Sequence, residues 1–110
     1  MKIRFFTPDT LPETRNWIKH MMLSVSLPAA LVCRRTIAEA DTRGDLGKIT
    51  TPTLILHGDA DASAPLSITG LKTARLIENS QLIVYPGAPH ALPLTHREEF
   101  ISDILSFVSN

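Results

Sequence analysis

The sequence predicts an α/β fold, because two strand-like runs alternate with two helical runs in its second half. The strand-like runs are 53–57 and 81–85, and the helical runs are 65–77 and 95–108. Strands that alternate with helices pair in parallel. Two parallel strands alone leave open sheet edges. The chain is therefore predicted to be one incomplete domain, either a piece of a larger sheet or a chain that pairs with others.

Each strand is predicted from its composition and from the residues that bound it. The run 53–57 is short and continuous and follows Pro52, which is typical of a strand covered on both faces. The run 81–85 ends at Pro86 and Gly87, two residues that favour a tight turn. Both runs are therefore interpreted as strands that end in loops at the same edge of a sheet.

Each helix is predicted from apolar residues that recur at helical spacing. The helix over 65–77 takes its apolar members from Leu66, Ile68, Leu71, Ala74, Leu76 and Ile77. The helix over 95–108 has Phe100, Ile101, Ile104, Leu105, Phe107 and Val108 on its inner side. Thr95 followed by Glu98 predicts a capping box at its start, because each side chain can accept a backbone N–H of the other.

The first half of the chain is predicted to be helical and to carry no strand. Apolar residues at helical spacing indicate helices over about 13–24 and 28–40. Pro28 suits the first turn of the second helix, where its missing N–H group costs nothing. The segment 41–47 is polar, contains two glycines and is predicted to be a loop.

Composition limits the class of protein. The 110 residues carry zero formal net charge, which indicates neither a nucleic-acid partner nor an acidic membrane surface. No apolar run approaches the roughly 20 residues of a membrane-spanning helix. Cys33 is the only cysteine and has no partner for an internal disulfide, which is typical of a reducing compartment. Because the sequence shows no secretion signal, a cytoplasmic location is expected.

Two titratable residues follow the two predicted strands. Asp61 lies four residues past the first strand, and His90 lies five residues past the second. Catalytic groups collect outside the carboxyl ends of strands in open α/β sheets, so we expect the two side chains to meet. A carboxylate that accepts an imidazole N–H fixes the tautomer and stabilises the imidazolium. The alternatives are a turn-forming Asp61 and a surface His90, and Asp59 is expected to cap its own turn.

The other histidines are predicted to be structural. His57 ends the first strand and is expected to be a packed, hydrogen-bonded turn residue. His96 is expected to orient the loop that carries His90. The histidines show no H-x-x-x-H or H-x-H spacing and have no partner cysteines, so no metal site is predicted.

Several of these segments resemble a known family. "PTLILHGDADASAP", "LIVYPGAPH", "LTH" and the final amphipathic helix resemble the C-terminal third of α/β-hydrolases, in the branch of cofactor-free (non-haem) haloperoxidases and aryl esterases. "MMLSVSL" and "AEADTRGDL" are similar to that branch's helical cap, and the resemblance covers about residues 17–108. The family commonly has phenylalanine and glycine where this chain has Thr42 and Ala91.

The resemblance implies a partial α/β-hydrolase fold with a defined division of the chain. Residues 1–45 would be a helical segment derived from the cap. Residues 46–110 would be the last strand–helix–strand–helix part of the sheet. Asp61 would be the acid and His90 the base of a catalytic triad, and no cofactor is implied.

The implied function is that of a fragment of a serine hydrolase acting on small carboxylic esters, with peracid formation as a further reaction. The nucleophile of this fold lies on a G-x-S-x-G turn, which the chain does not contain. We therefore expect the isolated chain to be inactive. One alternative is a non-catalytic truncated or split chain that associates with an N-terminal partner, or with itself through its sheet edge. Another is C–C or dehalogenating hydrolysis, which the identity of the missing nucleophile would decide.

Overall fold

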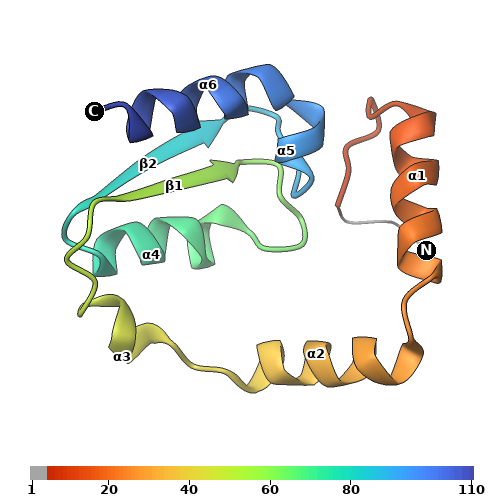
Figure 1. Ribbon diagram of the computed structural model, residues 1–110, viewed down its shortest axis with the longest axis horizontal. Coiled ribbons are helices and arrows are strands. Elements are labelled where there is room, and N and C mark those ends of the chain that lie inside the picture. Colours follow the sequence, from red (N-terminus) through yellow and green to blue (C-terminus); the bar gives the residue numbers. More distant parts are fainter. Residues whose placement is uncertain (1–4) are drawn as a thin grey trace.

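The computed structural model describes residues 5–110 and shows two strands flanked by helices (Figure 1). The element order begins with helices, alternates strand and helix from residue 53, and ends with a long helix. The elements are α1 (Pro12–Leu23), α2 (Leu27–Glu39), α3 (Arg43–Leu46), β1 (Thr53–Gly58), the 3-10 turn η1 (Leu66–Ile68), α4 (Gly70–Leu76), β2 (Ser80–Tyr85), α5 (Leu92–Thr95) and α6 (Arg97–Val108).

The sheet is parallel, as the alternation of strands and helices predicts. β1 pairs with β2 in a register that runs from Thr53 opposite Ser80 to Gly58 opposite Tyr85. Helices α4 and α6 cover opposite faces of this pair (Figure 1). Both strands therefore end at the same edge, and the loops that follow them leave the sheet side by side.

The helix predicted over 65–77 is interrupted. Its first turn is the 3-10 turn η1, and α4 begins only at Gly70. The interruption lies at Thr69, whose hydroxyl donates to the carbonyl oxygens of Ala64, at 3.2 Å, and Pro65, at 2.8 Å. A threonine side chain that bonds to the preceding turn competes with the regular helical ladder.

The helix predicted over 95–108 is present as α6, which begins two residues later at Arg97, and its predicted capping box is wrong. α5 precedes α6, and His96, the residue between them, has a non-helical backbone. No side chain caps the first turn of α6. The Thr95 hydroxyl instead lies 2.8 Å from Nδ1 of His96.

The segment 41–47 is not entirely a loop, because it contains the single helical turn α3. The Asp41 carboxylate starts this turn by accepting the backbone N–H of Arg43 at 3.1 Å. Its other oxygen pairs with the Arg43 guanidinium at 2.6 Å. The polar composition of this segment therefore supplies a side-chain acceptor at the start of a helical turn.

The best-packed part of the protein lies directly beneath the ends of the strands. Tyr85, Ala88 and Leu92 form one buried cluster, and the partly buried residues packed against it are Leu56, Ile83 and Phe100. Ala88 has no exposed surface, and Pro89 is almost completely buried. The loop that carries His90 is thus supported by the core.

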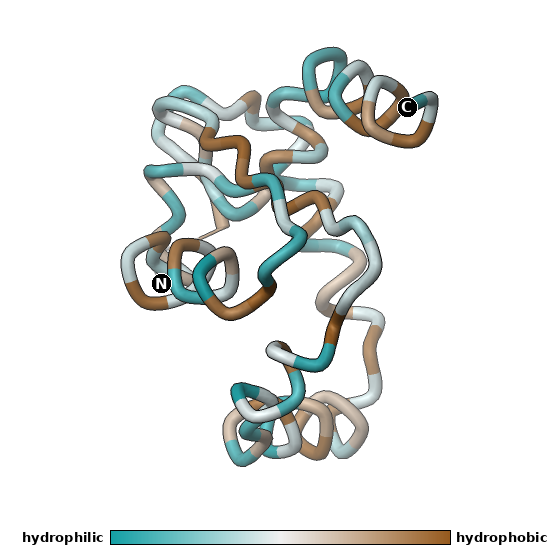
Figure 2. The backbone as a smooth tube through the Cα atoms, turned by 90° about the vertical axis from the view of Figure 1, so that its left-hand side faces the viewer, coloured by the Kyte–Doolittle hydropathy of each residue, from teal (hydrophilic) through white to brown (hydrophobic). Residues whose placement is uncertain are grey.

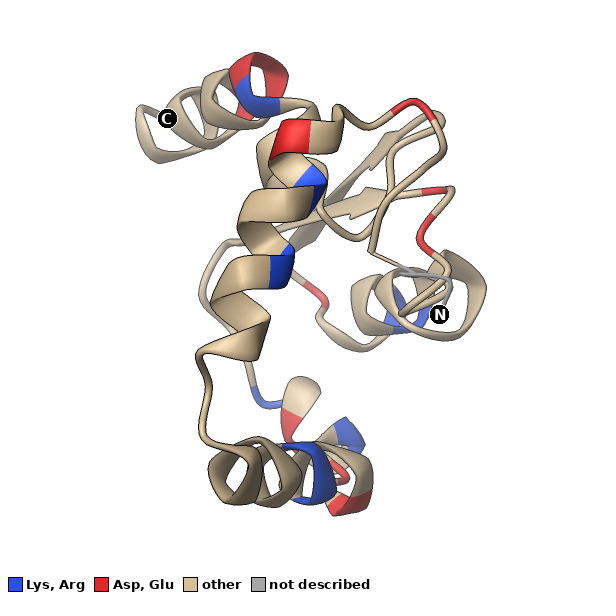
Figure 3. Cartoon of the chain, turned by 90° about the vertical axis from the view of Figure 1, so that its right-hand side faces the viewer, with Lys and Arg blue, Asp and Glu red and all other residues tan. Residues whose placement is uncertain are grey.

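Helices α1 and α2, in the first half of the chain, contribute no residue to this core. Helices α1 and α2 have no buried residue, and several of their large apolar side chains, such as Trp17 and Leu31, are more than half exposed. Figure 2 shows hydrophobic positions along α6 as well. Figure 3 shows acidic and basic residues interspersed along the chain. The radius of gyration is 15.5 Å, against about 13 Å for a compact domain of this length.

Within residues 5–110, no single helix has the length and apolar character needed to cross a membrane. The pair α1 and α2 passes that test only when taken together, and the two helices are bent by 101° at their junction.

Gly58, the last residue of β1, lies against the backbone of Ala88 in the loop after β2. A Cβ atom on Gly58 would lie 2.0 Å from the carbonyl oxygen of Ala88 and 2.6 Å from its carbonyl carbon. Both are backbone atoms of a fully buried residue, so neither can move aside. Only glycine allows this approach, and the approach holds the two loops together.

We expect Gly58→Ala to lower the free energy of unfolding by about 1–3 kcal/mol, because a methyl group would be forced into backbone atoms. Urea unfolding followed by circular dichroism measures this change. Gly44→Ala is the matched control, since nothing lies within 4 Å of its Cβ position. An equal loss of stability in both variants would contradict the prediction.

Candidate functional site

The turn after β1 and the loop after β2 are joined by backbone hydrogen bonds. The N–H of Asp59 donates to the carbonyl of Tyr85 at 3.2 Å, and that of Ala60 to the carbonyl of Ala88 at 3.1 Å. The Asp59 carboxylate accepts the N–H of Gly87 at 2.6 Å. The expectation that Asp59 caps its own turn is therefore wrong, because its carboxylate links the two loops.

The loop after β2 begins with a tight turn that the Pro-Gly pair predicts. Gly87 has a φ of 71°, and the N–H of Ala88 returns to the carbonyl of Tyr85 at 3.2 Å. Proline followed by a glycine with positive φ is the pattern of a type II turn. The turn directs the chain across the end of β1, where Pro89 is buried and His90 follows it.

Asp61 is buried and both of its carboxylate oxygens are bound. Its Oδ1 accepts the N–H groups of Ser63, at 2.8 Å, and Ala64, at 2.7 Å. Its Oδ2 lies 2.7 Å from Nδ1 of His90. The carboxylate is thus both the turn-former and the partner of His90, two roles that sequence reasoning treats as alternatives. One oxygen performs each role.

His90 is held by one ring nitrogen, and within residues 5–110 its other ring nitrogen has no hydrogen-bond partner. A carboxylate without a proton can only accept, so Nδ1 of His90 carries the hydrogen and donates it to Asp61. The side chain of His90 is 42% exposed, whereas that of Asp61 is 5% exposed. When the ring is neutral and its hydrogen is on Nδ1, Nε2 is unprotonated and can take a proton from a reacting group.

The environment of Asp61 favours its ionised form. Burial acts to raise the pKa of Asp61, but the hydrogen bonds from Ala64, His90 and Ser63 outweigh it, and the pKa lies below its usual value. The carboxylate is therefore charged at neutral pH. A buried charge of this kind is stabilised by the donors around it.

The other histidines near the site make structural contacts. Nε2 of His57 lies 2.8 Å from the carbonyl of Ala64 and 3.5 Å from Oδ2 of Asp61. Since a carbonyl only accepts, Nε2 of His57 carries the hydrogen and supports the turn that Asp61 organises. His96 packs edge-on against Tyr85, with 6.2 Å between the ring centroids. Both rings therefore lie in the framework around the pair.

Phe5 is a neighbour of His90 that the sequence does not indicate. The two rings lie with centroids 5.0 Å apart and planes inclined by 57°. The carbonyl of Phe5 also accepts the N–H of Ala91 at 2.9 Å. Phe5 and His90 are 85 positions apart in the sequence. No local sequence pattern indicates contact over such a separation.

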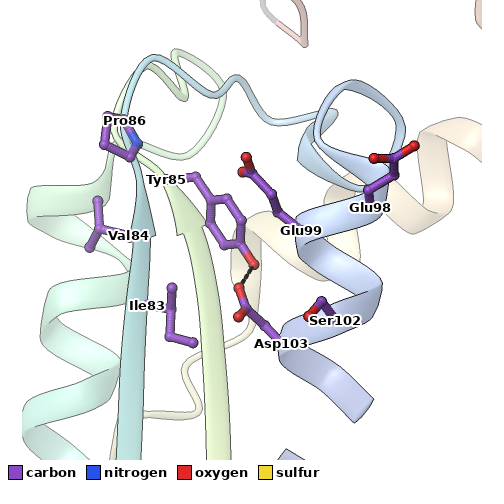
Figure 4. A pocket seen from close by; sticks show the side chains of 8 residues that line it. All are labelled: Ile83, Val84, Tyr85, Pro86, Glu98, Glu99, Ser102 and Asp103. Atoms are coloured by element: carbon purple, nitrogen blue, oxygen red, sulfur yellow. Dashed lines mark hydrogen bonds between the residues drawn. The ribbon is translucent and has the colours of Figure 1, made fainter. Parts of the chain in front are cut away.

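Two hollows lie near the strands, and only one contains the pair. A hollow of about 160 Å³ is lined by Leu56, His57, Gly58, Asp61, Pro89, His90, Leu92, Pro93 and Phe100. A larger one, about 520 Å³, lies between β2 and α6 and is lined by acidic side chains and Tyr85 (Figure 4). Within it, the Tyr85 hydroxyl donates a hydrogen bond to the Asp103 carboxylate. Burial raises the pKa of Tyr85 well above its usual value, so this hydroxyl stays protonated.

The described part of the chain does not complete a nucleophilic site or a metal site. Among residues 5–110, no serine hydroxyl is hydrogen-bonded to His90, and the ring's one side-chain hydrogen bond is to Asp61. The nearest serine in sequence, Ser63, is bound to the acid through its backbone N–H. In the same residues, no group of three or more His, Cys, Asp or Glu is placed to hold a metal ion. The arrangement is thus an oriented acid–base pair.

Comparison with known proteins identifies the fold to which this pair belongs. No protein-family model matches the chain. A bifunctional esterase/perhydrolase of Acinetobacter calcoaceticus is 44% identical over 71 residues, which are 64% of this chain and 26% of that protein. The crystal structure of a bromoperoxidase from Bacillus anthracis superposes on 93% of this chain and 37% of its own, with a TM-score of 0.88 and 35% identity.

An esterase from Exiguobacterium antarcticum gives a TM-score of 0.89 at 26% identity, over 97% of this chain and 40% of its own. The chain thus spans between about a quarter and two fifths of the length of these relatives. The likeness extends over the helical first half as well as the strands. The chain belongs to the α/β-hydrolases and corresponds to a C-terminal portion of the fold shared by non-haem haloperoxidases and esterases.

Proposed function

We propose that Asp61 and His90 are the acid and the base of a Ser–His–Asp triad that acts on small carboxylic esters. The observation that carries this proposal is the 2.7 Å contact between Oδ2 of Asp61 and Nδ1 of His90. It leaves Nε2 of an exposed ring free, beside a hollow at the ends of the strands. The esterase/perhydrolase relative supports the same reaction class.

The proposed reaction is acyl transfer through a serine that the chain itself does not supply. Nε2 of His90 takes the proton of the serine hydroxyl as its oxygen bonds to the ester carbonyl carbon, and returns it to the alcohol that leaves. Water then attacks the acyl-serine and releases the carboxylic acid. Hydrogen peroxide in place of water releases a peracid.

Asp61 has two tasks in this mechanism. It keeps the hydrogen of His90 on Nδ1, and it stabilises the imidazolium that forms when Nε2 takes a proton. Both tasks require an ionised carboxylate, and the lowered pKa of Asp61 is consistent with that requirement. Its hydrogen bonds to Ser63 and Ala64 keep its second oxygen directed at the ring.

We further propose that the chain associates with a partner, either a nucleophile-bearing segment of the same fold or a second copy. The chain exposes 8382 Å², about 2,400 Å² more than a folded monomer of 110 residues. A standard protein interface buries about 1,200–2,000 Å². β1 has one strand neighbour in residues 5–110, so its other edge is open to pairing.

The catalytic proposal is tested with p-nitrophenyl acetate. We expect no saturable hydrolysis by the 110-residue chain alone. Hydrolysis is expected when the chain is mixed with the N-terminal portion of the Acinetobacter relative, which this chain does not match and which the proposal expects to supply the serine. Asp61→Asn should lower kcat of the mixture by roughly 10³–10⁴, because the wrong tautomer of His90 becomes populated.

Glu78→Gln is the control for this experiment, since Glu78 is exposed and lies in the turn before β2, at the opposite end of the strand from His90. Activity of the isolated chain that His90→Ala abolishes would contradict the expected inactivity. Full activity of the mixture containing His90→Ala would contradict the proposed role of this residue.

Asp61 should also make stability depend on pH. Its folded pKa lies below the unfolded value of about 3.9, so its contribution is complete above about pH 5 and disappears as the pH falls through the folded pKa. At pH 6, Asp61→Asn should cost about 1–3 kcal/mol through weakened hydrogen bonds.

The measurement is urea unfolding of the wild type and Asp61→Asn at pH 6 and at pH 2.5. The difference between the two proteins should shrink at the lower pH. Asp9 and Asp41 also have lowered pKa values, but they are present in both proteins and cancel in the comparison. A difference that is constant between the two pH values would be inconsistent with this account.

The association proposal predicts a mass above the 12.1 kDa monomer when the chain is purified alone. Light scattering coupled to size exclusion, over a range of micromolar concentrations, measures it. Addition of the N-terminal portion should convert the self-associated species into a one-to-one complex. A chain that is strictly monomeric, unfolds cooperatively and does not bind the N-terminal portion would overturn the proposal.

A further inference from the structure

His90 needs a second restraint besides its bond to Asp61. The side chain is 42% exposed, and in the part of the chain that the structure describes its one side-chain hydrogen bond is through Nδ1. A ring held at one nitrogen can still turn away and exchange that bond for water. The backbone beneath it is fixed, because Ala88 is fully buried and Pro89 almost so. The remaining freedom lies in the side-chain torsions of His90.

Phe5 lies where it limits this freedom. Its ring is 5.0 Å from the imidazole, centroid to centroid, at an inclination of 57°. This is within the range in which aromatic rings attract one another. The hydrogen bond from Ala91 to the carbonyl of Phe5, at 2.9 Å, sets the two backbones side by side. The phenyl ring is therefore held against the imidazole by its own backbone.

The segment that carries Phe5 is anchored in turn by Arg15. The Arg15 guanidinium donates to the carbonyl oxygens of Thr7, at 2.5 Å, Pro8, at 2.6 Å, and Thr10, at 3.0 Å. Thr10 is itself buried. Because Arg15 belongs to α1, these bonds connect the first helix to the ring of His90 through residues 5–10.

We propose that Phe5 is a positioning residue for His90, and that Arg15 acts through it by holding residues 5–10 in place. Phe5 restricts the imidazole to the orientation that keeps Nδ1 on Asp61 and Nε2 free. The functional meaning of this restraint rests on the proposed role of His90 as the base. The restraint itself is a property of the chain alone and is measured without a substrate.

The test is nitrogen-15 NMR of the His90 ring in the full 110-residue chain, above the pH range in which histidine titrates. The wild type should show one neutral tautomer, with hydrogen on Nδ1. Phe5→Ala should raise the population of the other tautomer roughly two- to tenfold, the range that an aromatic pair contributes. Phe5→Tyr should restore the wild-type signals, and Arg15→Met should move them in the direction of Phe5→Ala.

Phe6→Ala is the matched control, because Phe6 is an adjacent phenylalanine of the same half-buried class. Wild-type ring signals in Phe5→Ala, or equal changes in Phe5→Ala and Phe6→Ala, would overturn the proposal. If Phe5→Ala unfolds by circular dichroism, Arg15→Met and Phe5→Tyr decide the outcome by the same signals. Failure of the esterase assay with these NMR results intact would overturn the proposed function and leave the restraint standing.

Discussion

The site depends on the close approach of two backbones at Gly58 and Ala88. Because position 58 has no side chain, the turn after β1 can lie directly on the loop after β2. Backbone hydrogen bonds and the Asp59 carboxylate then join the two segments. The 2.7 Å contact between Asp61 and His90 follows from that junction, because each residue lies a few positions from it. The acid–base pair is thus supported by main-chain geometry.

Order in this chain is concentrated where the chemistry lies. The buried cluster of Tyr85, Ala88 and Leu92 lies under the loop of His90, while α1 and α2 have no buried residue. A chain with this distribution has a well-ordered edge at the ends of its strands, and much of its remaining surface is exposed. The match to about a quarter to two fifths of longer α/β-hydrolases agrees with that surface. The proposals of a partner and of a nucleophile from outside the chain rest on the same physical fact.

Errors in the sequence-based prediction share one cause. Thr69 interrupts a helix that the apolar spacing predicts as continuous, and Thr95 does not form the predicted capping box. In each case the hydroxyl has a hydrogen-bond partner other than the one that helix rules assign: the carbonyls of Ala64 and Pro65 for Thr69, and the His96 ring for Thr95. Asp59 likewise bonds across to Gly87 rather than within its own turn. A short polar side chain has several acceptors or donors in reach, and the folded backbone selects among them.

The sequence by itself determined the parallel strand–helix alternation, the turns at the strand ends and the two residues that meet there. These features depend on periodicity, on proline and glycine, and on distances of a few positions, all of which are local properties of the chain. Only the tertiary structure decided which oxygen of Asp61 faces His90, and that Phe5 packs against that ring. Those contacts join residues 29 and 85 positions apart. Their geometry is set by the packing of the whole chain, which no local pattern encodes.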